Sequence, residues 1–216
     1  MKTTWIAGAV LALGLAGTNV ALADGNAQAG QTKAAVCAGC HGPDGNSPLD
    51  QWPKLAGQLP AYIGKQLHDF KAGRRKNDQM SPMAQPLSDQ DIQDLAAYFS
   101  SQKASRVAVA RNERLALGER IYLKGKGRPE VVPACVGCHG PGGVGKADWP
   151  VTMIREPVVL APAIGSQHAA YTGAQLKAYK TGGRSNDLSH VMRDVAGRLS
   201  EGEIAAVADY VASLGR

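Results

Sequence analysis

Apolar residues recur at helical spacing in two stretches that each follow a serine. After Ser88, positions 92, 95, 96 and 99 fall on one helical face, and after Ser200 the same holds for positions 204, 207, 208 and 211. Ser88 with Asp91, and Ser200 with Glu203, form a capping-box pattern, which marks the first turn of a helix. Two closing helices are therefore predicted, with inward residues Ile92, Leu95, Ala96, Phe99, Ile204, Val207, Ala208 and Val211.

Further helices are predicted over residues 27–36, 60–71, 111–124 and 170–180. Pro60 suits the first turn of the second of these, and Gly73 is a stop signal just after it. No convincing pair of strands with alternating apolar and polar residues is evident. The pattern predicts an all-α protein.

The second half of the sequence repeats the first. Residues 36–43 match 134–141, and the later matches pair Pro53 with Pro162, Gln58 with Gln167, Tyr62 with Tyr171, Gln66 with Gln175, Arg75 with Arg184, and Asn77 with Asn186. Two copies indicate a domain duplication rather than a solenoid. We predict a first domain over 24–102 and a second over 103–216, joined by a linker at 101–110. An extra segment near 151–160 lengthens the second copy.

The N-terminus has the composition of a secretory signal. Lys2 supplies the positive start, residues 5–15 are apolar, and Ala21-Leu22-Ala23 fits the small-residue cleavage rule. Residues 1–23 are therefore predicted to be cleaved. An uncleaved membrane anchor is the alternative, disfavoured because the apolar run is shorter than the ~20 residues that cross a bilayer. We expect a soluble mature protein in a bacterial periplasm.

The formal charge of +6 does not indicate a nucleic-acid partner. The basic residues are dispersed and form neither a long run nor a stripe with aromatic residues. Export argues against nucleic-acid binding as well.

All four cysteines lie in two copies of one motif. Cys37-Ala-Gly-Cys40-His41 and Cys135-Val-Gly-Cys138-His139 each have the Cys-x-x-Cys-His pattern that attaches a c-type haem. Two covalently attached haem c groups are therefore predicted. The four cysteines would form the thioether bonds, and His41 and His139 would each bind an iron. Zinc binding and redox-active disulfides are alternatives, but neither explains the adjacent histidine or the export signal.

A haem iron that only transfers electrons needs a second axial ligand opposite the histidine. A methionine thioether would fill that position and would raise the reduction potential. Met80 and Met192 both stand eight residues before the serine that opens the closing helix, which favours Met80 over Met83. Packing in the core is the competing role for either methionine. His190, two residues before Met192, is the rival ligand in the second domain.

Other residues are candidates for orienting the haems. The axial imidazoles need acceptors for their second N–H, and the carbonyls of Pro53 and Pro162 are positioned for this, although Pro150 rivals Pro162. Candidate donors to the haem propionates are Trp52, Tyr62, Arg75, Trp149, Tyr171 and Arg184, for which packing or solvation is an equal alternative.

With these motifs in both halves, the chain resembles the dihaem cytochrome c4 family over essentially all of its predicted mature length. The resemblance implies two tandem class I cytochrome c domains with His/Met ligation at both irons. It also implies electron transfer from a quinol-oxidising complex, such as a cytochrome bc1-type complex, to a terminal oxidase. The extra segment near 151–160 departs from the family pattern.

The expected function is therefore that of a periplasmic electron carrier, a monomer without catalytic residues, with peripheral membrane association left open. The alternatives are the cytochrome subunit of a sulfur-compound dehydrogenase and a dihaem peroxidase. A stable enzyme partner, or an iron able to open a coordination position, would distinguish them.

Overall fold

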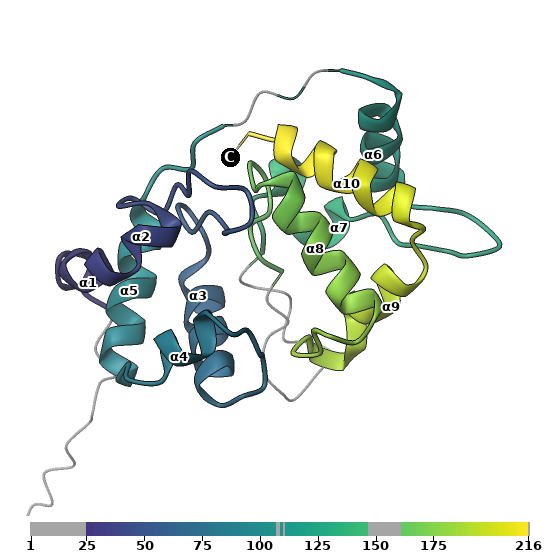
Figure 1. The fold of residues 1–216 in the computed structure, drawn as a ribbon. Helices are drawn as coiled ribbons and strands as arrows, with labels where there is room; N and C mark the ends of the chain where they lie inside the picture. The colour runs from purple at the N-terminus through teal and green to yellow at the C-terminus, as the bar shows by residue number, and fades with distance from the viewer. Residues whose placement is uncertain (1–24, 107–108, 110, 147–160, 216) are drawn as a thin grey trace, which may run out of the picture.

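Two helical units lie side by side in the computed structural model, which describes residues 25–106, 109, 111–146 and 161–215 (Figure 1). The first unit contains α1 (Ala27–Lys33), η1 (Ala34–Val36), α2 (Ala38–His41), α3 (Pro60–Lys71), α4 (Met80–Ala84) and α5 (Asp89–Ser101). The second contains α6 (Glu113–Lys124), α7 (Val136–His139), η2 (Pro141–Gly143), α8 (Ala169–Lys180), η4 (Leu188–His190), α9 (Val191–Gly197) and α10 (Glu201–Ser213). The predicted signal and the extra segment lie outside the described residues.

Each unit is organised around its closing helix. Helices α1 and α3 pack on α5, and α6 and α8 pack on α10 in the same way. The four predicted inward residues of each closing helix are buried there, with Phe99 and Val211 among the least exposed. Within the described residues the only β pairings are isolated bridges, Lys126 with Val132 and Lys146 with Ala161. The all-α prediction is confirmed.

Two glycines allow the first and last helices of each unit to cross closely. A Cβ on Gly30 of α1 would lie 2.0 Å from the carbonyl oxygen of Asp94, and one on Gly118 of α6 would lie 1.9 Å from that of Ala206. These distances are below any tolerated contact, so both crossings require glycine. This requirement was not among the predictions from the sequence.

Local signals placed most helix ends correctly. Both capping boxes form as predicted, at Ser88 and at Ser200. Helix α6 begins two residues later than predicted because the Asn112 side chain caps it, accepting from the Leu115 N–H at 2.8 Å. The short helices α4 and α9 were not predicted.

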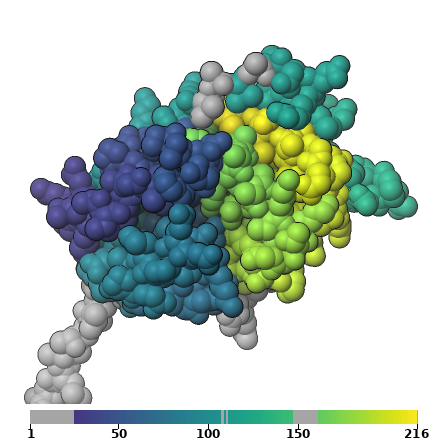
Figure 2. Space-filling view, in the orientation of Figure 1, coloured from purple at the N-terminus to yellow at the C-terminus, as the bar shows by residue number. Residues whose placement is uncertain are grey.

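The two units pack directly against each other, as the space-filling view shows (Figure 2). The Gln58 side chain pairs with both backbone groups of Ala163, donating to its carbonyl and accepting from its N–H at 2.8 Å each. The Gln167 side chain makes the equivalent pair with Lys54, at 2.9 Å each. Because Gln58 and Gln167 match in the repeat, the interface has approximate twofold symmetry.

No helix in the described part of the chain is long and apolar enough to span a bilayer.

Candidate haem centres

Each Cys-x-x-Cys-His motif folds into a single helical turn, α2 or α7. The His41 N–H donates to the Cys37 carbonyl at 3.0 Å, and the His139 N–H to the Cys135 carbonyl at 2.9 Å. The glycine after each histidine has a positive φ, 78° at Gly42 and 76° at Gly140, and turns the chain away. Residues three and four apart on a helical turn are neighbours, so the thiols and the imidazole can face one planar ligand.

The two imidazoles are buried and held in equivalent ways. His41 Nδ1 donates to the Pro53 carbonyl at 2.8 Å, and His139 Nδ1 to the Pro162 carbonyl at 2.9 Å, as expected. Nδ1 therefore carries the proton, and Nε2 keeps the lone pair that a metal needs. Burial is the main cause that lowers the pKa of both histidines, which favours the neutral, ligating form.

The four cysteines are unbridged thiols. Burial raises the pKa of Cys37 and Cys138, and it raises the pKa of Cys135 to about 11. A cluster of three or more histidine, cysteine or acidic side chains that could hold a metal ion is not found among the described residues. Each motif places two thiols and one imidazole on a single helical turn, a donor set that suits covalent haem attachment with one imidazole per iron.

Met80 and Met192 occupy equivalent places in the two units. Met80 opens α4 and is partly buried, whereas Met83 on the same helix is 43% exposed. Met192 lies in α9 and packs against the second core, as do Cys135 and Val136. Met80 and Met192 stay the predicted thioether ligands. Met153, in the extra segment and predicted to pack rather than to bind iron, lies outside the described residues.

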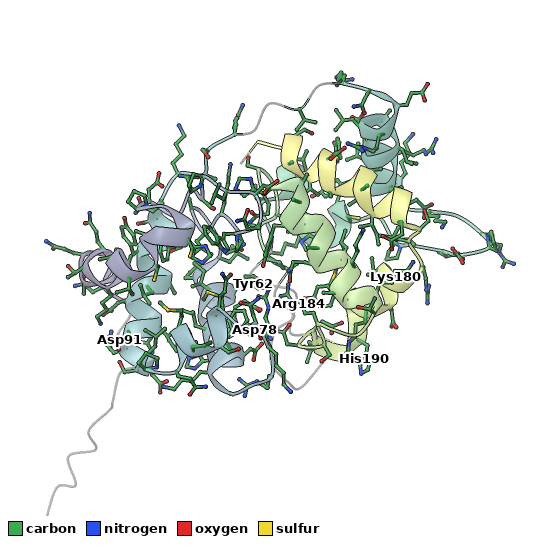
Figure 3. All side chains as sticks on the ribbon, in the orientation of Figure 1. Tyr62, Asp78, Asp91, Lys180, Arg184 and His190 are labelled. Carbon is green, nitrogen blue, oxygen red and sulfur yellow. The ribbon has the colours of Figure 1, made fainter. Side chains whose placement is uncertain are left out.

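The other histidines lie elsewhere. His68 is partly exposed and stands 3.8 Å from the Asp89 carboxylate. His168, at the start of α8, donates from Nε2 to the Ser47 carbonyl at 3.0 Å, which links the two units. His190 is exposed and lies near the lower edge of the second unit in Figure 3, away from the labelled pair Tyr62 and Arg184.

Arg75 and Arg184 meet at the boundary between the units. Arg75 donates to Gln66, to Gln175 and to the Tyr171 hydroxyl at 2.8 to 3.0 Å. Arg184 repeats this set with Gln175, Gln66 and the Tyr62 hydroxyl at 2.8 to 3.0 Å. Each guanidinium also lies 4.6 Å from a ring centroid, Phe70 for Arg75 and Tyr179 for Arg184.

This arrangement concentrates positive charge at the interface. Both arginines share Gln66 and Gln175 as acceptors, and Arg184 is only 6% exposed. Burial alone would raise the pKa of Tyr62, but the charges of Arg184 and Arg75 bring it below its usual value. No carboxylate is ion-paired with either arginine among the described residues. A buried cation such as Arg184 needs hydrogen-bond acceptors or an anion to compensate its lost hydration, and the haem propionates stay the predicted anion.

The two tryptophans that were candidate donors to the haem propionates are Trp52 and Trp149. The Trp52 indole N–H donates to the Gln79 side chain at 3.0 Å. Trp149 lies outside the described residues. The glutamine pairs at Gln58 and Gln167 were not predicted as functional residues. Their signal was their position in the repeat, because each lies five residues after a proline whose carbonyl accepts from an axial histidine.

The comparisons with known proteins agree with this geometry. The family profile described as Cytochrome c matches residues 27–103 and 115–215. Cytochrome c4 of Pseudomonas aeruginosa is 46% identical over 206 residues, covering 95% of this chain and 96% of the relative. The thiosulfate dehydrogenase electron acceptor of Thiomonas intermedia is 37% identical, covering 94% of this chain and 90% of the relative.

The solved structure of reduced recombinant cytochrome c4 from Pseudomonas stutzeri matches with a TM-score of 0.78 at 45% identity. The match covers 88% of this chain and 99% of that structure. Two cytochrome c segments, two Cys-x-x-Cys-His turns and this match over both units are consistent with two haem c groups and with electron transfer rather than catalysis. The chain therefore belongs to the cytochrome c4 family of dihaem electron carriers.

Proposed function

We propose that the protein carries electrons in the periplasm from a quinol-oxidising complex of the cytochrome bc1 type to a terminal oxidase. Family membership supports the carrier role, and the signal-like residues 1–23 support export. The observation that carries the haem-based carrier role is the pair of buried imidazoles whose Nδ1 protons are held by Pro53 and Pro162, because this leaves Nε2 ready for iron in both units.

The proposed haem ligands are the same in each unit. Cys37 and Cys40 would hold the first haem and Cys135 and Cys138 the second, with axial pairs His41 with Met80 and His139 with Met192. Haem iron supplies one-electron chemistry when bound.

The residues of this chain would then orient the haems and set their charge environment. Pro53 and Pro162 fix the imidazole planes. Arg75 and Arg184 would neutralise propionate carboxylates between the units, with Tyr62 and Tyr171 as further hydrogen-bonding groups. The paired glutamines hold Lys54 and Ala163, each the residue after one of these prolines, so the interface supports both imidazoles.

Separate Met80→Ala and Met192→Ala variants test the ligand assignment. Each variant is expected to lose one of two sulfur-to-iron charge-transfer contributions in the ferric spectrum and to lower one of two reduction potentials. Met83→Ala is the matched control on α4 and should leave both potentials in place. A high-spin or bis-histidine haem in the native protein would contradict the carrier assignment.

The direction of electron flow needs a second experiment. Membranes that contain a bc1-type complex, given a quinol, should reduce the purified protein, and membranes that contain a terminal oxidase should reoxidise it. If neither membrane preparation exchanges electrons with the protein faster than a Met80→Ala, Met192→Ala double variant does, this pathway is wrong.

A second candidate is that the protein accepts electrons from a sulfur-compound dehydrogenase. The similarity to the thiosulfate dehydrogenase electron acceptor of Thiomonas intermedia favours it. Purified thiosulfate dehydrogenase with thiosulfate would then reduce the protein at a rate that exceeds reduction by the quinol-oxidising membranes. A slower rate would favour the respiratory role.

A further inference from the structure

The two units differ at one point of the interface. Asp69 of α3 is 3% exposed, and the matching position in α8 is Ala178. Lys65 likewise matches Ala174. The first unit therefore has a charged pair beside the interface that the second unit lacks.

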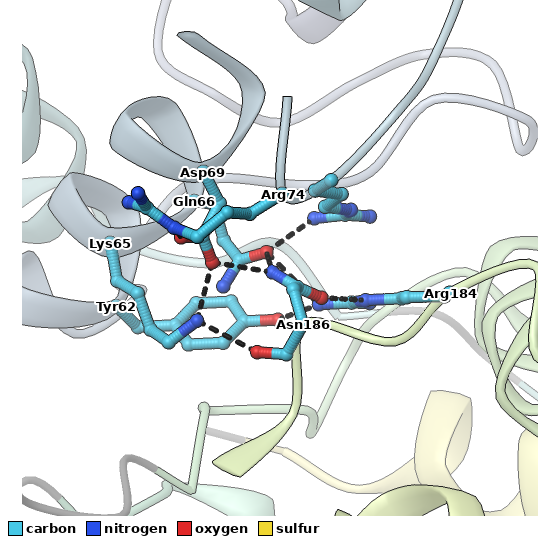
Figure 4. A network of polar contacts seen from close by, with 8 residues as sticks. Tyr62, Lys65, Gln66, Asp69, Arg74, Arg184 and Asn186 are labelled. Carbon is cyan, nitrogen blue, oxygen red and sulfur yellow. Dashed lines mark hydrogen bonds and ion pairs between the residues drawn. The ribbon is translucent and has the colours of Figure 1, made fainter. Parts of the chain in front are cut away.

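This pair holds a residue of the second unit. Asp69 accepts from the Asn186 side-chain amide at 2.6 Å, and Gln66 accepts from the same amide at 3.0 Å. Lys65 donates both to Asp69 and to the Asn186 carbonyl. Figure 4 shows Asn186 enclosed by Lys65, Gln66 and Asp69, with Arg184 on its other side.

The matching asparagine of the first unit makes only local contacts among those described. The Asn77 side-chain oxygen accepts from the N–H of Gln79 at 3.1 Å and of Met80 at 2.8 Å. It therefore holds the backbone at the start of α4, where Met80 lies. In the second unit this local role passes to Asp187, which accepts from the Arg193 N–H at 3.0 Å and from its side chain at 2.7 Å.

Asn186 lies six residues before Met192, and the chain between them is unusual. Relative to the first unit, three residues are added before the methionine, where η4 (Leu188–His190) forms. Ser189 and His190 have positive φ values of 52° and 61°, a conformation that side chains other than glycine adopt infrequently. Such a conformation persists only where its surroundings hold it, so the anchor at Asn186 matters for the path to Met192.

We propose that Asp69 of the first unit is a positioning residue for the axial methionine of the second. By holding Asn186 across the interface, it fixes the segment that presents Met192. Met80 is held by Asn77 within its own unit and has no such dependence. The inference rests on the proposed function, since it takes Met192 as the ligand of the second iron.

The test uses Asp69→Ala and Asp69→Asn in the haem-loaded protein. Alanine is the natural residue at the matching position 178, so α3 should accept it. Asparagine removes the charge but keeps an acceptor for the Asn186 amide. The difference between the two variants therefore separates the positioning role from a general effect of charge.

Imidazole is the probe, because it competes with methionine for a ferric haem. Loss of the Met192 anchor should raise the population with that methionine dissociated. The apparent dissociation constant for imidazole then falls in proportion. We expect a fall of about tenfold at the second haem in Asp69→Ala, the size expected for a lost charge-assisted hydrogen bond. Asp69→Asn should recover most of it.

Proton NMR of the reduced protein assigns the effect to one haem. Each methionine ligand gives a shifted methyl signal, identified by its loss in Met80→Ala or Met192→Ala. In Asp69→Ala the Met192 signal should move or broaden while the Met80 signal stays, and Asn77→Ala should do the reverse. Asn186→Ala gives the same test from the other side of the contact if Asp69→Ala does not fold.

Equal movement of both signals, or no change in imidazole affinity in Asp69→Ala and Asn186→Ala, would overturn the positioning role. Two methionine signals in the native protein would still support the ligand assignment in that case. Absence of the Met192 signal from the native protein would instead contradict the proposed function itself.

Discussion

Replacing Gln58 by leucine should uncouple the two units. The Gln58 side chain makes two hydrogen bonds of 2.8 Å to the backbone of Ala163, which is 2% exposed. Leucine keeps the volume but leaves a buried N–H and a buried carbonyl without these partners. Each unsatisfied group costs about 1–3 kcal/mol, which gives about 2–6 kcal/mol if the interface stays closed.

The interface can also open, so that water bonds to the unpaired N–H and carbonyl groups and limits the loss of stability. We therefore expect a decrease of about 2–3 kcal/mol in the free energy of unfolding. Gln167→Leu should have a similar effect, because Gln167 makes the equivalent pair with Lys54. In the double variant the second change should cost less than it does alone, since the two glutamines hold one interface.

Urea unfolding, monitored by haem absorption and by far-UV circular dichroism, measures the free energy of unfolding and the coupling between the units. Native protein should unfold with coincident transitions, and the single variants should show two separated ones as the units lose their coupling. Gln28→Leu, on the exposed side of α1, is the matched control. A change below about 0.5 kcal/mol in both single variants, or strict additivity in the double variant, would refute the reasoning.

Three further predictions follow from particular contacts. Gly118→Ala should lower the free energy of unfolding, measured by thermal unfolding, by about 1–3 kcal/mol, because its Cβ would lie 1.9 Å from the Ala206 carbonyl oxygen. Gly202→Ala, where a Cβ would meet open space, should raise the free energy of unfolding instead. Equal effects of the two substitutions would contradict the packing argument. The pKa of Asp69 is below its usual 3.8, although burial alone would raise it, because Lys65, Asn186 and Arg74 donate to it. The carboxylate of Asp69 therefore contributes fully to stability above pH 3.8, and this contribution is lost as the pH falls through the lowered pKa. When the free energy of unfolding is measured between neutral and acidic pH, it should fall less steeply with acid in Asp69→Asn than in the native protein. An equally steep fall in both proteins would contradict the stabilising role of the Asp69 carboxylate. Arg184→Gln removes a buried positive charge, so both reduction potentials should fall relative to the exposed-site control Arg120→Gln, and a rise in either would exclude an anion site between the units.

The parts of the fold that were predictable from sequence depend on local signals. The capping boxes at Ser88 and Ser200 and the proline at position 60 act within one helical turn, so their patterns placed α3, α5 and α10 correctly. Helices α4 and α9 are too short for a period of 3.6 residues to show, and Pro82 within α4 argues against a helix there.

The interface was less accessible from the sequence because its contacts join side chains to distant backbone. Nothing in the residues near Gln58 indicates that its amide pairs with Ala163, 105 positions away. The repeat did single out Arg75 and Arg184, but it could not show that each reaches across the interface to the tyrosine of the other unit. Asn77 accepts from the backbone N–H of Met80 in its own unit, whereas its match Asn186 donates across the interface to Asp69, a difference within the repeat that only the three-dimensional contacts reveal.

The most direct test of the account is the mass of the purified, acid-denatured protein, produced in a host that matures c-type cytochromes. The mass should equal that of the mature polypeptide plus two haems, and it should fall by one haem when either cysteine pair is replaced by alanine. A colourless protein with the mass of the bare polypeptide would contradict covalent haem attachment at Cys37, Cys40, Cys135 and Cys138, on which every functional conclusion depends.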